Sequence, residues 1–197
     1  EMRGILLLTT YVAVVAAFQP APWHRTSVAA YSSIAAYPQQ YSSSISATIS
    51  IGCPASAACA AYADLEKFPE YSPLLKSVKV IGEGRSEWAL QIPKLVARLV
   101  RAFGMGSLVK WEAEFAVDGG DSDPRLTWQS VTGFKNAGVA TFAVISDDRC
   151  EVTVEMSYSV PKVLRPIEQS RTIQNFMRNT MIGAMERFRI DLEQTVQ

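Results

Sequence analysis

The last part of the chain changes its hydrophobic period from two residues to between three and four. Apolar and polar residues alternate from Glu151 to Val160, which predicts a strand with one buried and one exposed face. Pro161 and Pro166 interrupt this pattern, because proline has no amide donor for a strand ladder. From Ile167 onward the apolar period predicts a long amphipathic helix that needs a broad apolar surface to lie on. Its apolar stripe consists of Ile173, Met177, Met181, Ala184, Phe188 and Leu192.

Strand-like alternation also occurs in six earlier segments, which are residues 44–51, 74–83, 85–92, 109–117, 125–131 and 136–145. In the last of these, either Val139 or Phe142 is expected to face inward. Between the first two segments, Pro54 and an alanine-rich run predict a short helix, and Pro69 is expected to end a second one. The order predicts an α+β domain, in which a seven-stranded antiparallel meander wraps around the C-terminal helix.

Composition supports one globular domain with a large core. Of the 197 residues, 48% are hydrophobic and 19% are charged, and the net charge of zero gives no general reason to expect a nucleic-acid partner. Cys53, Cys59 and Cys150 are not spaced as a disulfide framework or a zinc knuckle. The only histidine, His24, lies in the predicted leader, so the domain itself offers no imidazole for a metal or a nucleophile pair. We therefore expect neither a metal nor another cofactor.

Residues 1–43 are predicted to be a leader, and residues 44–197 the ligand-binding domain. The leader begins with one basic residue and a short apolar run, as in a secretory signal peptide. The segment that follows contains no acidic residue before Asp64 and is rich in serine, which is typical of an organelle transit peptide. The junction from Ala17 to Pro20 resembles the cleavage motif of bipartite leaders in algae with secondary plastids. We expect a plastid location, with secretion as the alternative.

The stretch Ala61-Tyr-Ala-Asp-Leu-Glu-Lys-Phe-Pro-Glu-Tyr-Ser-Pro-Leu-Leu-Lys-Ser-Val-Lys-Val-Ile81 resembles the signature of the coenzyme Q-binding START-domain family. Residues 109–114, 126–130 and 152–158 also resemble strands of that family. The family belongs to the polyketide cyclase/dehydrase and lipid-transport superfamily, and the resemblance extends over about residues 46–192. It implies a helix-grip (START-like) fold, in which a curved seven-stranded sheet surrounds the C-terminal helix and a ligand cavity. These motifs concern packing and turns, so they carry more about fold than about function.

The residues expected to face inward form a large aromatic and methionine-rich set. They are Trp88, Trp111, Phe115, Trp128, Phe142, Met156 and Tyr158 from the strands, with Phe176, Met181 and Met185 from the helix. Such a set is typical of a cavity for an elongated apolar ligand, and a solid core is the alternative. Tyr158 and Ser130 are the best inward polar candidates, but the sequence places no activating base beside them, so no catalytic residue is assigned.

A second segment, residues 93–107, combines an apolar helical face with basic flanks. Leu95, Leu99 and Phe103 share that face, and Arg98 and Arg101 lie beside it. Such a segment is typical of a gate that docks on an anionic membrane, and a lid packed permanently on the domain is equally compatible.

The sequence as a whole favours non-catalytic binding or transport of a hydrophobic small molecule, such as a prenylquinone, a lipid or a pigment. One alternative is a polyketide cyclase or dehydratase, which would need inward polar groups with perturbed pKa values. Another is an assembly or structural subunit whose cavity is vestigial, which would expose an apolar patch elsewhere.

Overall fold

The computed structural model describes residues 41–91, 108–120, 123–159, 169 and 171–195, apart from the side chains of residues 172 and 173. The strands are β1 (Ser43–Ile51), β2 (Leu75–Gly82), β3 (Arg85–Gln91), β4 (Leu108–Asp118), β5 (Arg125–Ser130), β6 (Asn136–Ser146) and β7 (Arg149–Tyr158). The helices are α2 (Ala55–Tyr62), the 3-10 helix η2 (Leu65–Lys67), α3 (Phe68–Tyr71) and α6 (Arg171–Thr195). Each predicted strand is present to within a few residues.

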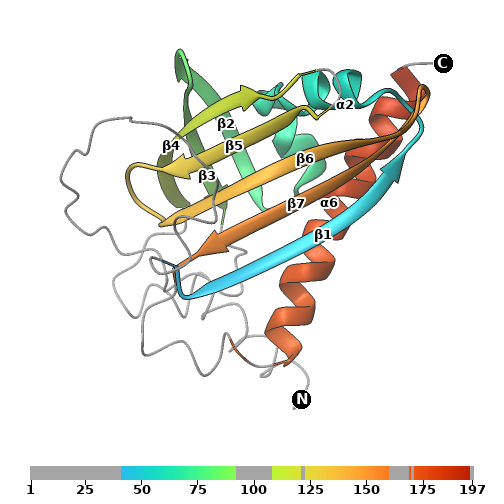
Figure 1. The fold of residues 1–197 in the computed structure, drawn as a ribbon. Helices are drawn as coiled ribbons and strands as arrows, with labels where there is room; N and C mark the ends of the chain where they lie inside the picture. Colours follow the sequence, from blue (N-terminus) through green and yellow to red (C-terminus); the bar gives the residue numbers. More distant parts are fainter. Residues whose placement is uncertain (1–40, 92–107, 121–122, 160–168, 170, 196–197) are drawn as a thin grey trace.

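The seven strands form one antiparallel sheet in the order β1-β7-β6-β5-β4-β3-β2. The first strand therefore lies at one edge beside the last strand, and α6 runs along the same side of the sheet (Figure 1). From β2 to β7, strands that follow one another in the sequence are also antiparallel neighbours in the sheet, as the predicted meander requires. The α+β prediction and the curved seven-stranded sheet with a C-terminal helix are confirmed.

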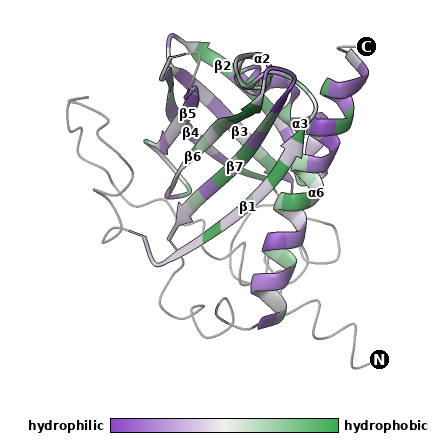
Figure 2. Cartoon of the chain, turned by 45° about the vertical axis from the view of Figure 1, so that its right-hand side comes forward, coloured by the Kyte–Doolittle hydropathy of each residue, from purple (hydrophilic) through white to green (hydrophobic). Residues whose placement is uncertain are grey.

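One face of the sheet is apolar and packs toward α6, whereas the other is polar. On β1 the residues Ile45, Ala47, Ile49 and Ile51 are buried, and the serines and threonine between them are exposed. The partners of these four residues on β7 are Met156, Val154, Val152 and Cys150. Apolar and polar residues alternate along β7 and along α6 (Figure 2). Burial of one face per strand follows from a side-chain period of two.

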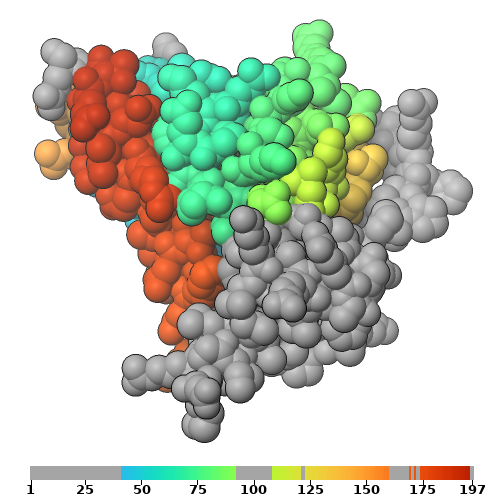
Figure 3. Space-filling view, turned by 180° about the vertical axis from the view of Figure 1, so that it is seen from behind, coloured from blue at the N-terminus to red at the C-terminus, as the bar shows by residue number. Residues whose placement is uncertain are grey.

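The main core lies between the sheet, α2, α3 and the C-terminal half of α6. Tyr62 of α2 is near its centre, with ring centroids 4.9 Å from Phe68, 5.6 Å from Phe142 and 5.3 Å from Phe188, all in edge contacts. Seen from the opposite side, α6 lies next to the short helices, which lie next to the β2–β3 hairpin (Figure 3). The short helices thus connect the long helix to the far strands of the sheet.

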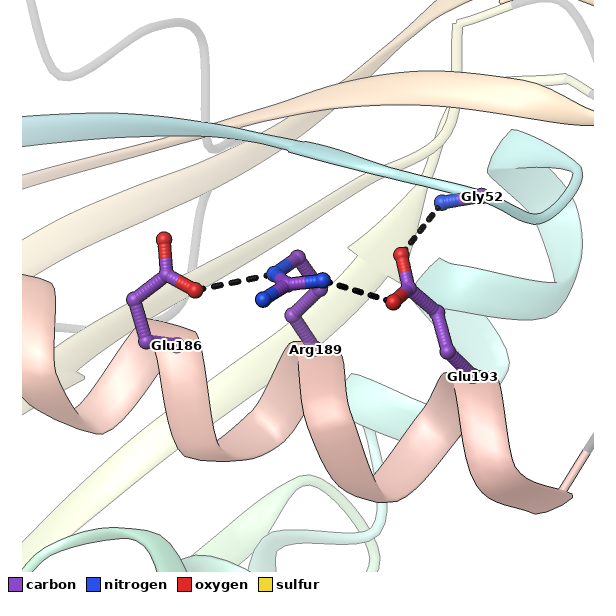
Figure 4. A network of polar contacts seen from close by, with 4 residues as sticks. All are labelled: Gly52, Glu186, Arg189 and Glu193. Carbon is purple, nitrogen blue, oxygen red and sulfur yellow. Dashed lines mark hydrogen bonds and ion pairs between the residues drawn. The ribbon is translucent and has the colours of Figure 1, made fainter.

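The end of α6 is attached to the β1–α2 link by a polar network (Figure 4). Arg189 lies between Glu186 and Glu193, at 2.8 and 2.6 Å from their carboxylate oxygens. The second oxygen of Glu193 accepts a hydrogen bond of 2.9 Å from the amide of Gly52. Residues 141 positions apart are therefore joined where β1 ends.

Two local predictions are corrected or resolved. Pro69 does not end a helix; it lies in the first turn of α3, where a missing amide donor leaves no hydrogen bond unmade. On β6 the register places Phe142 on the buried face with Val152 opposite, and Val139 on the other face. Most of the predicted leader, the segment 93–107 and the predicted helix start at Ile167 lie outside the described residues.

Candidate ligand-binding face

A row of aromatic rings crosses the apolar face of the sheet from β3 to β7. Trp88 and Trp111 are directly opposite each other and stack at 5.8 Å with an interplanar angle of 12°. Phe134, in the β5–β6 link, lies 6.0 Å from Trp111 and 6.5 Å from Tyr158 of β7. We call these four residues the aromatic row. Such contacts stabilise by roughly 0.5–1.5 kcal/mol each beyond the burial of area, so the row forms a well-defined wall.

The β5–β6 link holds Phe134 in the row through backbone contacts with β4. The amide of Glu112 donates to the Thr132 hydroxyl at 3.1 Å. Gly133 has a φ of +69°, and a Cβ there would lie 2.5 Å from the carbonyl oxygen of Lys110. Only glycine meets both conditions, because other residues are strained at this φ and need room for a side chain. The link therefore turns sharply and directs Phe134 between Trp111 and Tyr158.

Methionines from β7 and α6 pack against the Tyr158 end of the row. Ile45 and Tyr158 are buried, with exposed fractions of 8% and 3%. Packed against these two residues are Met156, Met177, Met181 and Phe134. Met181 also packs against the main core, so it connects the two clusters. Unbranched methionine side chains adapt to irregular surfaces, which suits a wall that meets ligands of varied shape.

The indole nitrogens of Trp88 and Trp128 on this face each donate to a polar side chain of the sheet. The Trp88 indole nitrogen donates to the Ser86 hydroxyl at 2.9 Å, and Ser86 has no exposed surface. The Trp128 indole nitrogen donates to Oδ1 of Asn136 at 3.1 Å, and the Asn136 amide nitrogen donates to the Phe134 carbonyl at 2.9 Å. Within the described ranges no charged side chain is buried. The apolar face thus directs little unmet hydrogen-bonding capacity toward a ligand.

The groups with strongly raised pKa values lie in the main core, and Trp88 of the aromatic row packs against that core through Phe68. Burial raises the pKa of Tyr62 and Tyr71 above the ordinary value, and a hydrogen bond to Asp191 adds to the effect for Tyr71. Burial raises the pKa of Cys150 to about 12. These groups stay neutral near pH 7. Among the described residues there is no group of three or more side chains suited to a metal, and no helix long and apolar enough to cross a membrane.

The comparison with known proteins decides the family. The sequence profile of the polyketide cyclase/dehydrase and lipid transport family matches residues 42–196. The chain belongs to this family. No curated protein matches the chain.

Solved structures with the same fold include other START-like proteins. A START superfamily protein from Mycobacterium smegmatis is 11% identical, with 77% of this chain and 98% of that chain covered and a TM-score of 0.59. A protein from Thermus thermophilus is 17% identical, with 79% and 100% covered and a TM-score of 0.58. An aromatase/cyclase from a Streptomyces species is 10% identical, with 79% and 96% covered and a TM-score of 0.54. At these identities the likeness establishes the helix-grip fold of this family member, and not its activity.

The structure of this family member divides the predicted site residues into groups. Trp88, Trp111 and Tyr158 are in the aromatic row, Met156 and Met181 pack near it, and Trp128 is half-buried beside Asn136. Phe142 and Met185 are buried in the main core, and Phe115 packs against that core. Phe176 is half-buried on α6. The predicted gate residues Leu95, Arg98, Leu99, Arg101 and Phe103 lie outside the described residues.

Two residues of the face were missed by sequence reasoning. Phe134 lies in a link that has no hydrophobic period, and the neighbouring Gly133 was its only signal. Asn136, at 3% exposure, opens β6 and faces the same side as Trp128, although asparagine is uncommon in a buried strand position. Its burial depends on partners from other segments, which a local pattern does not contain.

Proposed function

We propose that this family member binds a hydrophobic small molecule without covalent chemistry, on the face formed by the aromatic row and the methionines around α6. The observation that carries the proposal is a broad apolar wall in which the indole nitrogens of Trp88 and Trp128 already donate to side chains of the sheet. A prenylquinone, a lipid or a pigment fits such a wall, because each offers much apolar area and few polar groups. Burial of that area supplies roughly 25 cal/mol per Å² before ordering costs are subtracted.

The family also contains cyclases, so the competing hypothesis is that the protein is an enzyme. A cyclase needs an acid or base aimed at its substrate. The polar group best placed for such a role is the hydroxyl of Tyr158, a residue that is 3% exposed and whose ring ends the aromatic row. A ligand recovered chemically unchanged supports binding, whereas a ligand that the protein converts, and that a Tyr158→Phe variant leaves unconverted, supports catalysis.

The test is mass spectrometry of organic extracts from the natively purified protein. The wild type is expected to retain an apolar molecule at a fixed stoichiometry. Met181→Trp places a larger side chain between α6 and the row, and it is expected to abolish retention without loss of the fold. Ile190→Trp is the matched control, because Ile190 is on the same helix but 46% exposed. Retention by Met181→Trp equal to that of the wild type would show that the ligand lies elsewhere.

We also propose that the protein acts in a plastid, on the strength of the acid-poor, serine-rich residues before Asp64. A fluorescent reporter joined to residues 1–45 is expected to accumulate in that organelle. Export of the reporter from the cell would favour the secretory alternative.

A further inference from the structure

A glycine on β6 makes room for a tryptophan of the neighbouring strand. Trp128 of β5 is opposite Gly138, which in turn is opposite Met156 of β7. A Cβ built on Gly138 would lie 2.0 Å from Cζ2 and 2.3 Å from Cη2 of Trp128. These distances are far inside van der Waals contact, so the indole occupies the place of a β6 side chain. Trp128 therefore leans across β6 rather than projecting from β5 toward α6.

Asn136 holds the nitrogen end of the same indole. Its Oδ1 accepts from Nε1 of Trp128 at 3.1 Å, and its own backbone amide donates to the Ser130 hydroxyl at 2.9 Å. Its amide nitrogen donates to the Phe134 carbonyl, which fixes the amide so that the oxygen faces Trp128. The indole edge from Nε1 to Cη2 thus follows β6 from Asn136 to Gly138.

We infer that Gly138 determines the ligand class of this face. Without a side chain at this position, the Trp128 indole lies close to the backbone of β6 and offers a flat aromatic surface, the platform, on which a neutral, conjugated ring can stack. The inference rests on the proposed function and narrows it from hydrophobic molecules in general to ring-bearing ones. Trp128 packs against the main core but is only half-buried, so part of its side chain remains exposed. A flat ring gains offset stacking on an indole, whereas a saturated acyl chain gains only area burial.

In this arrangement Trp128 contacts the ligand, and Gly138 and Asn136 are positioning residues. A side chain at position 138 would push the indole toward α6, into the space that the ring needs. Such a substitution should then reduce the affinity for ring-bearing ligands in particular, since a flexible chain can bend around a displaced side chain. If Gly138 had a purely structural role, its substitution would weaken the binding of both kinds of ligand to the same extent.

The experiment measures, by isothermal titration calorimetry at pH 7, the dissociation constants of two neutral ligands, 1-aminoanthracene as the ring probe and 1-dodecanol as the saturated-chain probe. The wild type is expected to prefer the ring probe. Gly138→Ala is expected to raise the dissociation constant of the ring probe by about tenfold or more and to change that of the chain probe much less. Gly82→Ala is the matched control, because a Cβ at Gly82 meets no atom within 4 Å.

A second variant keeps the test decisive if Gly138→Ala does not fold, since its Cβ would also lie 2.6 Å from the Glu155 carbonyl oxygen. Trp128→Leu adds no atoms at Gly138 and removes the platform, so it is expected to lose the ring preference while still binding the chain probe. If the wild type binds both probes and neither variant changes their ratio, the inference is wrong and the proposed function stands. If the wild type binds neither probe, both are wrong.

Discussion

At the scale of single residues, the apolar face depends on how its indole nitrogens are satisfied. A buried N–H without a partner costs about 1–3 kcal/mol, so a tryptophan wall needs acceptors built into the sheet. Ser86 supplies one for Trp88 from two positions earlier on the same strand, and Asn136 supplies one for Trp128 from the neighbouring strand. The two acceptors are also the two buried polar residues among those that the structure describes.

The Ser86–Trp88 pair gives a direct test of this cost. Ser86→Ala is expected to lower the free energy of unfolding by about 1 kcal/mol, because the Trp88 N–H loses its acceptor in a partly buried place. In a Trp88→Phe background the same change should cost clearly less, since phenylalanine has no N–H to satisfy. Urea denaturation of the four chains measures the coupling between the two positions. Equal costs in both backgrounds would show that the hydrogen bond does not stabilise the fold.

Residues whose role follows from a strand period were predictable, and residues placed by a turn were not. Trp88, Trp111 and Tyr158 lie on the inner face because side chains alternate along their strands, although on β3 Ala89 of the other face is buried as well. Phe134 enters the row only because Gly133 turns the chain against β4, a contact between segments that the sequence does not pair visibly. The part of the site that sequence reasoning missed is thus the part that depends on tertiary contacts.

At the scale of elements, the attachment of α6 to the β1–α2 link depends on one side chain, so a single substitution can test it. Glu193 accepts from the Gly52 amide and also pairs with Arg189, whereas Glu186 pairs with Arg189 alone. The side chain of Glu193 is 28% exposed and that of Glu186 is 43% exposed, so solvent screens the Glu186–Arg189 pair more strongly.

Glu193→Ala is therefore expected to lower the free energy of unfolding by about 1 kcal/mol, through loss of the Gly52 hydrogen bond and of an ion pair. Glu186→Ala, the matched control on the same helix, should cost about 0.5 kcal/mol or less. Thermal denaturation of both variants measures the difference. Hydrogen exchange at the Gly52 amide should become faster in Glu193→Ala only. Equal destabilisation by the two variants would contradict the assigned role of Gly52.

The elements themselves were predictable, and the pairing of the first strand was harder to foresee. Alternation gave each strand to within a few residues, because most of the strands bury one face. Alternation carries no information on which strands are neighbours, and β1 pairs with β7 across about a hundred residues of chain. The mistaken role of Pro69 has a local cause: a proline is equally compatible with the end of one helix and the first turn of the next.

At the scale of the whole molecule, the basic segment 93–107 remains a sequence-based prediction of contact with an anionic membrane. Replacing Arg98 and Arg101 together by glutamate is expected to weaken binding to phosphatidylserine-containing liposomes by about tenfold or more, because each basic residue near such a surface contributes about 1 kcal/mol. Lys76 and Lys79, exposed residues of β2, provide a charge-matched control when both are replaced by glutamate. Unchanged liposome binding after reversal of both arginines would favour a packed lid.

Alkaline pH acts on the whole core at once. Cys53, Cys59 and Cys150 are buried thiols, and burial raises the pKa of each above the ordinary 9.0, to about 12 for Cys150. Well below pH 9 the thiols are protonated in both the folded and the unfolded chain, so they do not change stability. Above pH 9 the unfolded chain loses these protons first, and the free energy of unfolding must fall as pH rises toward about 12.

The melting temperature is therefore expected to decrease between about pH 8 and about pH 11 under reducing conditions, with most of the decrease above about pH 9. A Cys150→Ala variant removes the thiol with the largest shift of the three. Its melting temperature should start lower, because a buried atom is lost, but decrease less steeply over the same range. Parallel curves for the wild type and Cys150→Ala would mean that Cys150 ionises as readily in the folded chain as in the unfolded one, and the thiol would then be open to solvent rather than part of the core.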